Sequence, residues 1–233
     1  MAIALIVAAC TASPAVPAVT SGPTPVPSAN RGSVAPAARL RYVALGDSYT
    51  IGTSVTAPER WPDQLVVAQP QLELVGNLGV NGFTSRDLIE VELPQLPELH
   101  PEFVTVLIGV NDVVQGISSS TYKDNVIQII TRLRELVPPD RIVVITTPDY
   151  TVTPAGADFG DPATQSAGIQ ERNWLITQLA EANDIVVVDI YDISLRAATD
   201  RTLVAGDGLH PSGAQYRLWV ARIAPAISAL LSP

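Results

Sequence analysis

The chain has 233 residues, of which 47% are hydrophobic and 16% charged, and its formal net charge is −9. This composition excludes a disordered chain, which combines low hydrophobicity with high net charge. The acidic balance argues against nucleic acid as a partner, because a surface that binds phosphates needs an excess of basic residues. One cysteine and two histidines exclude an intrachain disulfide, a cysteine-rich zinc site and any mechanism that needs three histidines.

The first ten residues predict a segment that directs export. Residues 2–9 form an apolar run, which is far shorter than the roughly 20 residues that span a bilayer. Such a run is typical of the apolar core of a signal peptide, although no basic residue precedes it here. It ends in Val7-Ala8-Ala9-Cys10, which resembles a bacterial lipobox. In that interpretation Cys10 is lipidated; the alternative is a chance cysteine after small residues.

Residues 11–38 predict an extended tether. The segment contains six prolines and a single charged residue, Arg31, and it lacks helix or strand periodicity. Proline favours extended, polyproline-like chain. We therefore expect one folded domain over residues 39–233, held away from a membrane or wall by the tether. The chain is then exported, either as a lipoprotein of the cell envelope or as a secreted protein.

Five short runs of aliphatic residues predict five strands in the domain. They cover residues 41–45, 72–75, 103–108, 142–146 and 185–189. Runs that are apolar at nearly every position are typical of strands covered on both faces. Helical spacing of apolar residues lies between these runs, at residues 60–68, 84–93, 122–136, 170–183 and 212–230. The alternation predicts a three-layer α/β/α domain with a five-stranded parallel sheet.

Residues that could react follow the predicted strands. The first strand runs into Gly46-Asp47-Ser48, and the third into a loop that holds Asn111. Gly82 lies in the loop after the second strand, and the last helix is preceded by the segment 207–211. In a parallel sheet the ligand site lies at the carboxyl ends of the strands. These four loops can therefore converge on one crevice.

The residue types in these loops are those that acyl transfer needs. A serine hydroxyl such as that of Ser48 needs an adjacent general base. An imidazole can serve, provided that a carboxylate fixes its tautomer. Asp207 precedes His210 by three residues, so its carboxylate can curl back to the imidazole Nδ1. The backbone N–H groups of Ser48 and Gly82 and the side-chain amide of Asn111 are candidate donors to an oxyanion.

Each of these features has a simpler interpretation when it is taken alone. Gly-Asp-Ser is a frequent loop tripeptide, Gly82 fits an ordinary turn, and Asn111 fits a turn or a helix cap. We expect Asp47 and Asp112 to brace their loops through backbone N–H groups. His100 precedes the third strand, at the edge of the sheet opposite to the crevice, so we do not expect it to be catalytic.

The combination and order of these motifs resemble the SGNH (GDSL-type) hydrolase family. The motifs are Gly-Asp-Ser, Gly-x-Asn-Asp and Asp-x-x-His-Pro, and residues 77–84 resemble the family's glycine block. The resemblance covers residues 42–230 and implies a flavodoxin-like sheet of strand order 2-1-3-4-5. It implies Ser48 as the nucleophile, His210 as the base and Asp207 as its orienting carboxylate. The implied oxyanion hole consists of Ser48, Gly82 and Asn111.

We therefore predict a serine esterase that works through an acyl-serine intermediate without a metal or cofactor. The substrate class stays open among small acyl esters, thioesters, lysophospholipids and acetylated sugars. We expect a monomer that meets a membrane only through its lipid anchor. The alternative is a non-catalytic lipoprotein that binds carbohydrate or lipid in the same crevice. A two-metal phosphoesterase that uses Asp47, Asn111 and Asp112 fits less well, because such sites also recruit several histidines.

The segment 148–170 is unusually long for a loop and contains Tyr150 and Phe159. We expect it either to line or cover an acyl pocket, or to be a plain surface loop.

Overall fold

The computed structural model describes residue 12 and residues 38–232. The predicted signal segment with Cys10 and almost all of the predicted tether lie outside these described residues. No helix among residues 38–232 is both long enough and apolar enough to cross a bilayer.

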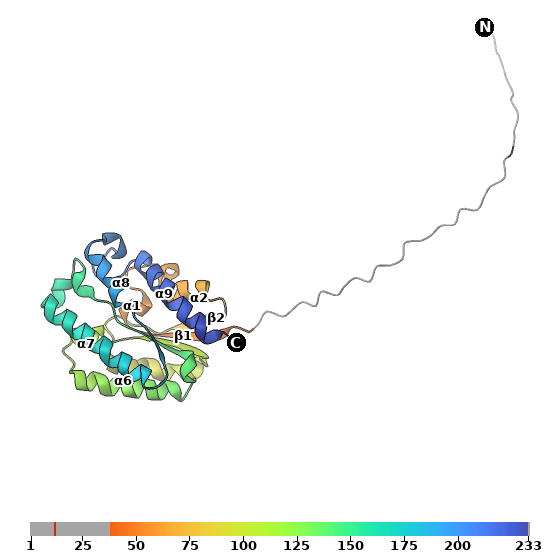
Figure 1. The fold of residues 1–233 in the computed structure, drawn as a ribbon, viewed down its shortest axis with the longest axis horizontal. Coiled ribbons are helices and arrows are strands. Elements are labelled where there is room, and N and C mark those ends of the chain that lie inside the picture. Colours follow the sequence, from red (N-terminus) through yellow and green to blue (C-terminus); the bar gives the residue numbers. More distant parts are fainter. Residues whose placement is uncertain (1–11, 13–37, 233) are drawn as a thin grey trace, which may run out of the picture. The chain divides into compact units, whose positions relative to one another are not determined.

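A five-stranded parallel sheet forms the centre of the domain (Figure 1). Its strands are β1 (Leu40–Gly46), β2 (Leu72–Asn77), β3 (Phe103–Leu107), β4 (Ile142–Ile145) and β5 (Val186–Val188). Their order is β2-β1-β3-β4-β5, and every neighbouring pair is parallel. This confirms the predicted fold class and the strand order that the family resemblance implied. The predicted strand ends agree with the observed ones to within two residues.

Helices cover both faces of the sheet and bury a core on each side. Successive residues of a strand point to opposite faces, so Tyr42 and Ala44 of β1 join one core, while Val43 and Leu45 join the other. The first core is completed by α2 (Trp61–Ala68) and α9 (Gly213–Leu231). The second is completed by α6 (Ser119–Arg134) and α7 (Pro162–Glu181). Strands buried on both faces explain the near-continuous apolar runs in the sequence.

The shorter helices follow individual strands. They are α1 (Ser48–Ile51) after β1, α3 (Ser85–Asp87) and α4 (Leu96–Leu99) after β2, α5 (Val110–Val114) after β3 and α8 (Tyr191–Leu195) after β5. Between α3 and α4 the chain stays helical, first as a π-helix over Leu88–Glu92 and then as a 3-10 helix over Leu93–Gln95. The helical region that begins after Thr84 therefore extends to Leu99, six residues beyond its predicted end.

The segment 148–170 is a loop only in its first part, so this expectation is corrected. Helix α7 begins at Pro162 rather than at residue 170. The side chain of Asp161 accepts a hydrogen bond from Thr164 N–H at 2.8 Å, which caps the helix. An Asp cap followed by Pro at the first helical position is a strong start signal. The apolar spacing that suggested residue 170 identified only the second half of the helix.

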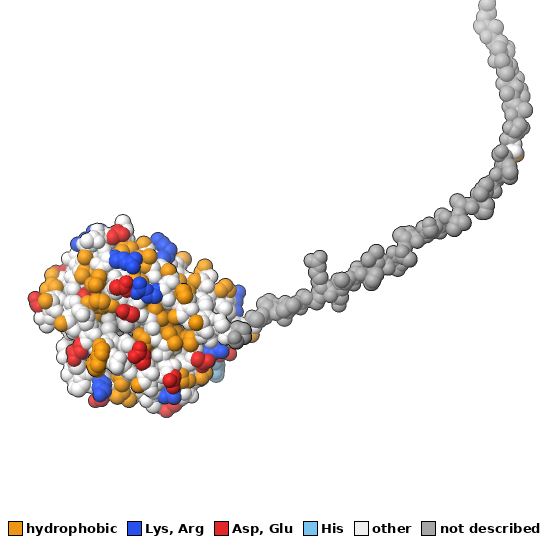
Figure 2. All heavy atoms as spheres, viewed as in Figure 1, with side chains coloured by type: hydrophobic (Ala, Val, Ile, Leu, Met, Phe, Trp, Pro, Cys, Tyr) orange, Lys and Arg blue, Asp and Glu red, His pale blue; other side chains and the backbone are white. Residues whose placement is uncertain are grey.

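The two ends of the described domain lie at the edge of the sheet from which the strands start. Figure 1 shows the end of α9 beside the start of β1. The side chain of Gln69, just before β2, donates to Ala224 O and Ser228 Oγ, both at 2.7 Å, and so ties the last part of α9 to this edge. On the face drawn in Figure 2, acidic and basic side chains are scattered among hydrophobic ones, and neither sign forms a continuous field.

Candidate active site

Ser48 stands on a tight turn at the carboxyl end of β1. Gly46 has φ +150°, and a Cβ there would lie 2.3 Å from Leu107 O on the neighbouring strand, so only glycine fits. Asp47 caps α1, because its Oδ1 accepts from Tyr49 N–H at 2.9 Å. Ser48 is then the first residue of the helix, and its N–H has no partner among the described residues. A free N–H at a helix start favours a developing negative charge beside it.

The loop after β2 packs directly on this turn. A Cβ at Gly79 would lie 2.8 Å from Asp47 O, so the two loops touch backbone to backbone. Gly82 follows with φ +80°, and the hydrogen bonds of the described residues leave its N–H free. The side chain of Gln115 donates to Gly82 O at 3.0 Å and fixes the orientation of this peptide. The loop therefore presents a second free N–H near Ser48.

Asn111 reaches the same place from the loop after β3. Its Nδ2 donates to Phe83 O at 2.9 Å, and the second hydrogen of that amide is left for a ligand. Asp112 accepts from Ser85 N–H at 2.9 Å and from the Ser85 hydroxyl at 2.5 Å, which joins α5 to α3. The expectation that Asp47 and Asp112 brace their loops through backbone N–H groups is confirmed by these bonds.

Asp207 and His210 form a hydrogen-bonded pair. The distance from His210 Nδ1 to Asp207 Oδ2 is 2.6 Å. The other carboxylate oxygen accepts from the backbone N–H groups of Leu209 and His210, at 2.9 and 3.0 Å. The hydroxyl of Ser54, which sequence analysis did not single out, donates to Asp207 Oδ2 at 2.7 Å. The carboxylate is thus held by four donors and cannot swing away from the imidazole.

These bonds keep Asp207 ionised. Partial burial alone would raise the pKa of its carboxyl group. The hydrogen bonds from the Ser54 hydroxyl, the Leu209 N–H and the His210 side chain outweigh that effect and hold the pKa of Asp207 well below its usual range. An ionised carboxylate on Nδ1 fixes the tautomer of His210 that carries its lone pair on Nε2.

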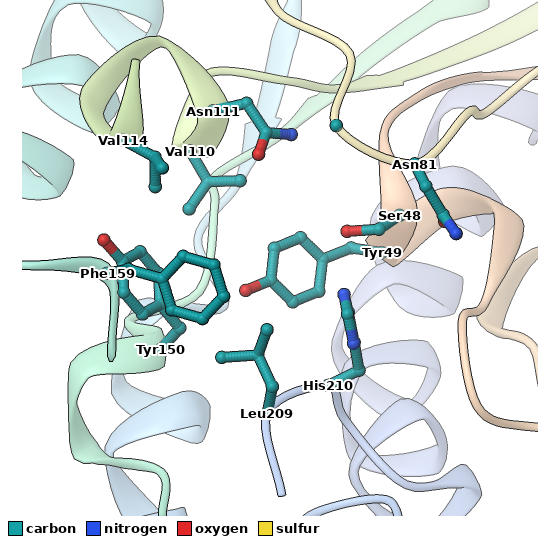
Figure 3. Close-up of a pocket in the computed structure, with 11 residues that line it drawn as sticks. Ser48, Tyr49, Asn81, Val110, Asn111, Val114, Tyr150, Phe159, Leu209 and His210 are labelled. Carbon is teal, nitrogen blue, oxygen red and sulfur yellow. The ribbon is translucent and has the colours of Figure 1, made fainter. Parts of the chain in front are cut away.

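The four loops and the segment after β4 line one cavity of about 210 Å³. Figure 3 shows the His210 ring directed at the Ser48 hydroxyl inside it, with Asn111 on the opposite wall. The ring of His210 packs against Tyr49, with centroids 5.5 Å apart. Neither Ser48 Oγ nor His210 Nε2 has a hydrogen-bond partner among the described residues, which leaves both free to engage a substrate. The cavity thus brings together Ser48, Gly82, Asn111 and His210, with Asp207 behind the ring.

A buried carboxyl group braces the turn that carries Ser48. Glu92 is fully buried, and its Oε2 accepts from Gly46 N–H at 2.9 Å. Burial is the main cause that raises the pKa of Glu92 to about 9, with the nearby Asp47 adding to it. Burial likewise raises the pKa of Asp47 to about 8. Glu92 lies at helical spacing between the buried residues Leu88 and Leu96, and an acid at such a position is a signal that could have identified it.

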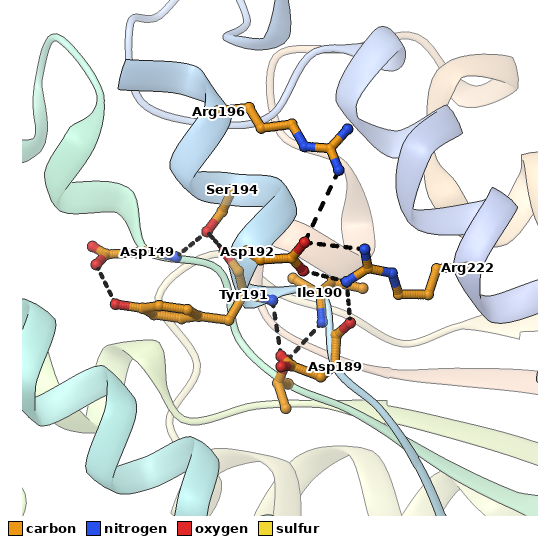
Figure 4. Close-up of polar contacts among 9 residues, drawn as sticks. Asp149, Asp189, Ile190, Tyr191, Asp192, Ser194, Arg196 and Arg222 are labelled. Carbon is orange, nitrogen blue, oxygen red and sulfur yellow. Dashed lines mark hydrogen bonds and ion pairs between the residues drawn. The ribbon is translucent and has the colours of Figure 1, made fainter. Parts of the chain in front are cut away.

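The ends of β4 and β5 are joined by a polar network drawn in Figure 4. Asp149 N–H donates to Ser194 Oγ at 2.8 Å, and the Tyr191 hydroxyl donates to Asp149 Oδ2 at 2.8 Å. Arg222 of α9 pairs with Asp192 of α8, with one N–O distance of 3.1 Å. The network fixes the segment that starts at Asp149 and so positions Tyr150, which lines the cavity.

The other histidine lies elsewhere. His100 is exposed at the end of α4, with φ +44°, on the side of the sheet where β3 begins. Within the described part of the chain, no group of three or more His, Cys, Asp or Glu side chains is arranged to hold a metal ion.

Residues 44–218 match a family model described as the GDSL-like lipase/acylhydrolase family. The chain belongs to this family. It is therefore a hydrolase. The matched region contains Ser48, Gly82, Asn111 and His210, which line the polar end of the cavity. A search of curated proteins finds no match to the sequence.

Solved structures with the same fold include other GDSL proteins. An α/β-hydrolase enzyme from the metagenome of Lake Arreo, Spain, has 22% identity and a TM-score of 0.64, over 84% of this chain and 98% of that one. A lipolytic G-D-S-L protein from Veillonella parvula has 17% identity and a TM-score of 0.65, over 79% and 96%. An acetylxylan esterase from Geobacillus stearothermophilus has 19% identity and a TM-score of 0.61, over 84% and 95%. At these identities the likeness shows the fold.

Proposed function

We propose that this GDSL hydrolase cleaves carboxylic esters through an acyl-serine intermediate. Ser48 Oγ attacks the ester carbonyl carbon while His210 Nε2 takes the hydroxyl proton. The imidazolium gives that proton to the leaving alcohol, and the carbonyl re-forms as an acyl-serine. Water then attacks the acyl group with His210 again as base, and the acid and free Ser48 are released.

The remaining residues stabilise the charges that develop during the reaction and orient the His210 ring. The carbonyl oxygen becomes negative in each tetrahedral intermediate, and the N–H groups of Ser48 and Gly82 and the amide of Asn111 are its donors. Asp207 stabilises the imidazolium and keeps the ring in the required tautomer. The observation that carries this proposal is the 2.6 Å bond from Asp207 to His210 Nδ1, with the opposite side of the ring directed at Ser48.

The test compares the full chain with Ser48→Ala on p-nitrophenyl esters. We expect the parent to turn over at least one ester and Ser48→Ala to lose activity by several orders of magnitude, because the covalent route is removed. A fluorophosphonate probe should label the parent at Ser48 and leave Ser48→Ala unlabelled. Ser120→Ala is the matched control, since Ser120 is an exposed serine on α6, and it should behave like the parent.

Two outcomes would contradict the proposal. Equal activity of parent and Ser48→Ala would mean that Ser48 is not the nucleophile. An absence of both turnover and labelling would favour the alternative, a protein that binds carbohydrate or lipid in the crevice without cleaving it.

Export and lipidation are part of the same proposal. Cys10 follows an apolar run whose last three residues are small or aliphatic, which supports a lipid anchor on that cysteine. In a bacterial host, metabolic labelling with a palmitate analogue should mark the parent and fail in Cys10→Ser. Labelling that persists in Cys10→Ser would refute this assignment.

A further inference from the structure

The cavity at Ser48 has two unlike sides. Figure 3 shows apolar side chains gathered on the side of Ser48 that lies away from Asn81. They come from α5, from the segment after β4 and from the histidine loop: Val110, Val114, Tyr150, Phe159 and Leu209. Most of the polar lining stands at the reacting end, at Ser48, Asn81, Asn111 and His210. The Tyr49 ring also lines the cavity, and its hydroxyl points towards the apolar side. The lining includes no lysine or arginine, so its apolar side offers no permanently charged partner to an anionic group.

The apolar side is a built wall. Phe159 ends a short 3-10 helix, Gly156–Phe159, and its ring packs edge-on against Tyr150 with centroids 5.7 Å apart. The Tyr150 hydroxyl is held by Gln165 Oε1 at 2.8 Å. Ala155 N–H donates to Gly208 O at 3.0 Å, which ties this wall to the loop of His210.

Phe159 nevertheless stays 40% exposed. Its ring contacts Tyr150 in a T-shaped arrangement, and it lines the cavity with the other apolar residues. When an apolar ligand covers an aromatic ring at the mouth of a cavity, apolar surface is removed from water, and this favours binding. The wall is therefore suited to an aliphatic chain.

The direction of the substrate follows from the reaction. The carbonyl oxygen must face the donors at Gly82 and Asn111, and the leaving oxygen must face His210 Nε2. The remaining substituent of the carbonyl carbon is the acyl chain, and the apolar side is the part of the cavity left for it. The alcohol then lies towards Asn81, which also borders an open depression with Thr53 and Ser54.

We infer that the acyl group of the substrate is an aliphatic chain of about four to eight carbons, bound between Val110, Val114 and Phe159. The size follows from the volume. A dry apolar cavity of about 150 Å³ holds benzene, with six carbons, and this cavity measures about 210 Å³. This inference rests on the proposed ester hydrolysis at Ser48. Within that chemistry it favours acyl groups of about four to eight carbons over the two-carbon acetyl group.

The test is a chain-length series on the full chain. We expect kcat/KM for p-nitrophenyl esters to rise by roughly fourfold for each methylene that enters the wall. The rise should begin beyond the acetate and end near the octanoate, since later methylenes remain in water. Decanoate and dodecanoate, used below their micelle concentrations, should give no further gain.

Two variants test where the acyl chain of the substrate binds. Val114→Phe fills part of the cavity, so it should lower kcat/KM on the octanoate by about tenfold or more while the acetate changes by less than about twofold. Phe159→Ala removes the outer wall and should lower the ratio of octanoate to acetate rates several-fold. The matched controls are Val67→Phe and Trp174→Ala, which alter an exposed valine of α2 and an exposed tryptophan of α7, 81% and 61% exposed. Both controls should keep the parent profile.

The outcomes separate this inference from the proposed function. Fastest turnover of the acetate, a rise that continues to the dodecanoate, or an unchanged profile in Val114→Phe would each overturn it, even if Ser48→Ala is inactive and ester hydrolysis stands. If no ester is cleaved, calorimetric titration of Ser48→Ala with 1-butanol, 1-hexanol and 1-octanol decides. Affinity that grows with chain length and is lost when Val114→Phe is added upholds the chain-binding wall; equal or absent binding overturns it.

Discussion

Replacing Glu92 by glutamine is expected to stabilise the folded domain at neutral pH. Glu92 is fully buried beneath the turn that carries Ser48 and accepts one hydrogen bond, from Gly46 N–H. Its second oxygen has no partner, and burial is the main cause that raises its pKa from 4.5 to about 9. The folded protein therefore carries Glu92 as a neutral acid at pH 7, while the unfolded chain carries it as an anion.

The magnitude follows from the linkage between protonation and folding. A pKa that is higher in the folded state makes stability greatest below the unfolded pKa of 4.5 and lets it fall as pH rises towards 9. Each pH unit in that window is worth about 1.4 kcal/mol, so at pH 7 the loss due to Glu92 is about 3 kcal/mol. Glutamine retains the carbonyl oxygen that accepts from Gly46 and cannot ionise. Glu92→Gln should therefore be more stable than the parent by about 3 kcal/mol at pH 7 and equal to it near pH 4.

Urea unfolding of the parent and Glu92→Gln at several pH values from 4 to 8 measures both stabilities and their slopes. The matched control is Glu90→Gln, which alters a neighbouring acid whose side chain is 54% exposed and pairs with Arg86 at 2.8 Å. That control should change the stability by less than about 0.5 kcal/mol at any pH. If Glu92→Gln is less stable than the parent at pH 7, or loses stability just as steeply with pH, Glu92 is ionised in the folded state and the reasoning fails.

Two further substitutions test the reacting groups. Asn111→Ala should lower kcat by about 10²–10³-fold with little change in KM, because one donor to the developing oxyanion is lost; a change confined to KM would place Asn111 in substrate binding instead. Ser54→Ala removes the 2.7 Å bond to Asp207 Oδ2, so the pKa of Asp207 should move up towards its usual value and kcat/KM should fall by about three- to tenfold. Because Ser54 is exposed, the thermal midpoint of Ser54→Ala should match that of the parent. A fall in both kcat/KM and the thermal midpoint would instead indicate a folding defect.

The strands, and the convergence of the candidate site residues on one cavity, could be predicted because both depend on local sequence. β1 and β3 are largely buried on both faces, so each is a nearly continuous apolar run that leads to a glycine. Asp207 and His210 lie three residues apart, so their pairing needs only one turn of chain. Ser48, Gly82 and Asn111 all follow strands of one parallel sheet, and such a sheet delivers strand ends to a common edge.

The partners that the sequence analysis missed are distant in the chain. Ser54 lies 153 residues from Asp207, and no spacing rule connects a hydroxyl in one loop with a carboxylate in another. Glu92 is 46 residues from Gly46 and sits in a region where π, 3-10 and α turns succeed one another. The predicted helix ended near residue 93, so the four-residue spacing of Leu88, Glu92 and Leu96, which places Glu92 on the buried face, was not recognised. The early start of α7 was missed because Asp161-Pro162 was read as loop sequence rather than as a cap.

The position of the chain ends has a practical consequence. The described domain starts and finishes at one edge of the sheet, and β1, with seven residues, leads from that edge to the Ser48 turn. At about 3.3 Å per residue this is roughly 20 Å. A carrier protein or a solid support joined at residue 38 or residue 232 would therefore stand behind the domain, with the mouth of the cavity facing away. An immobilised enzyme of this kind would still meet esters displayed on large, slowly diffusing particles.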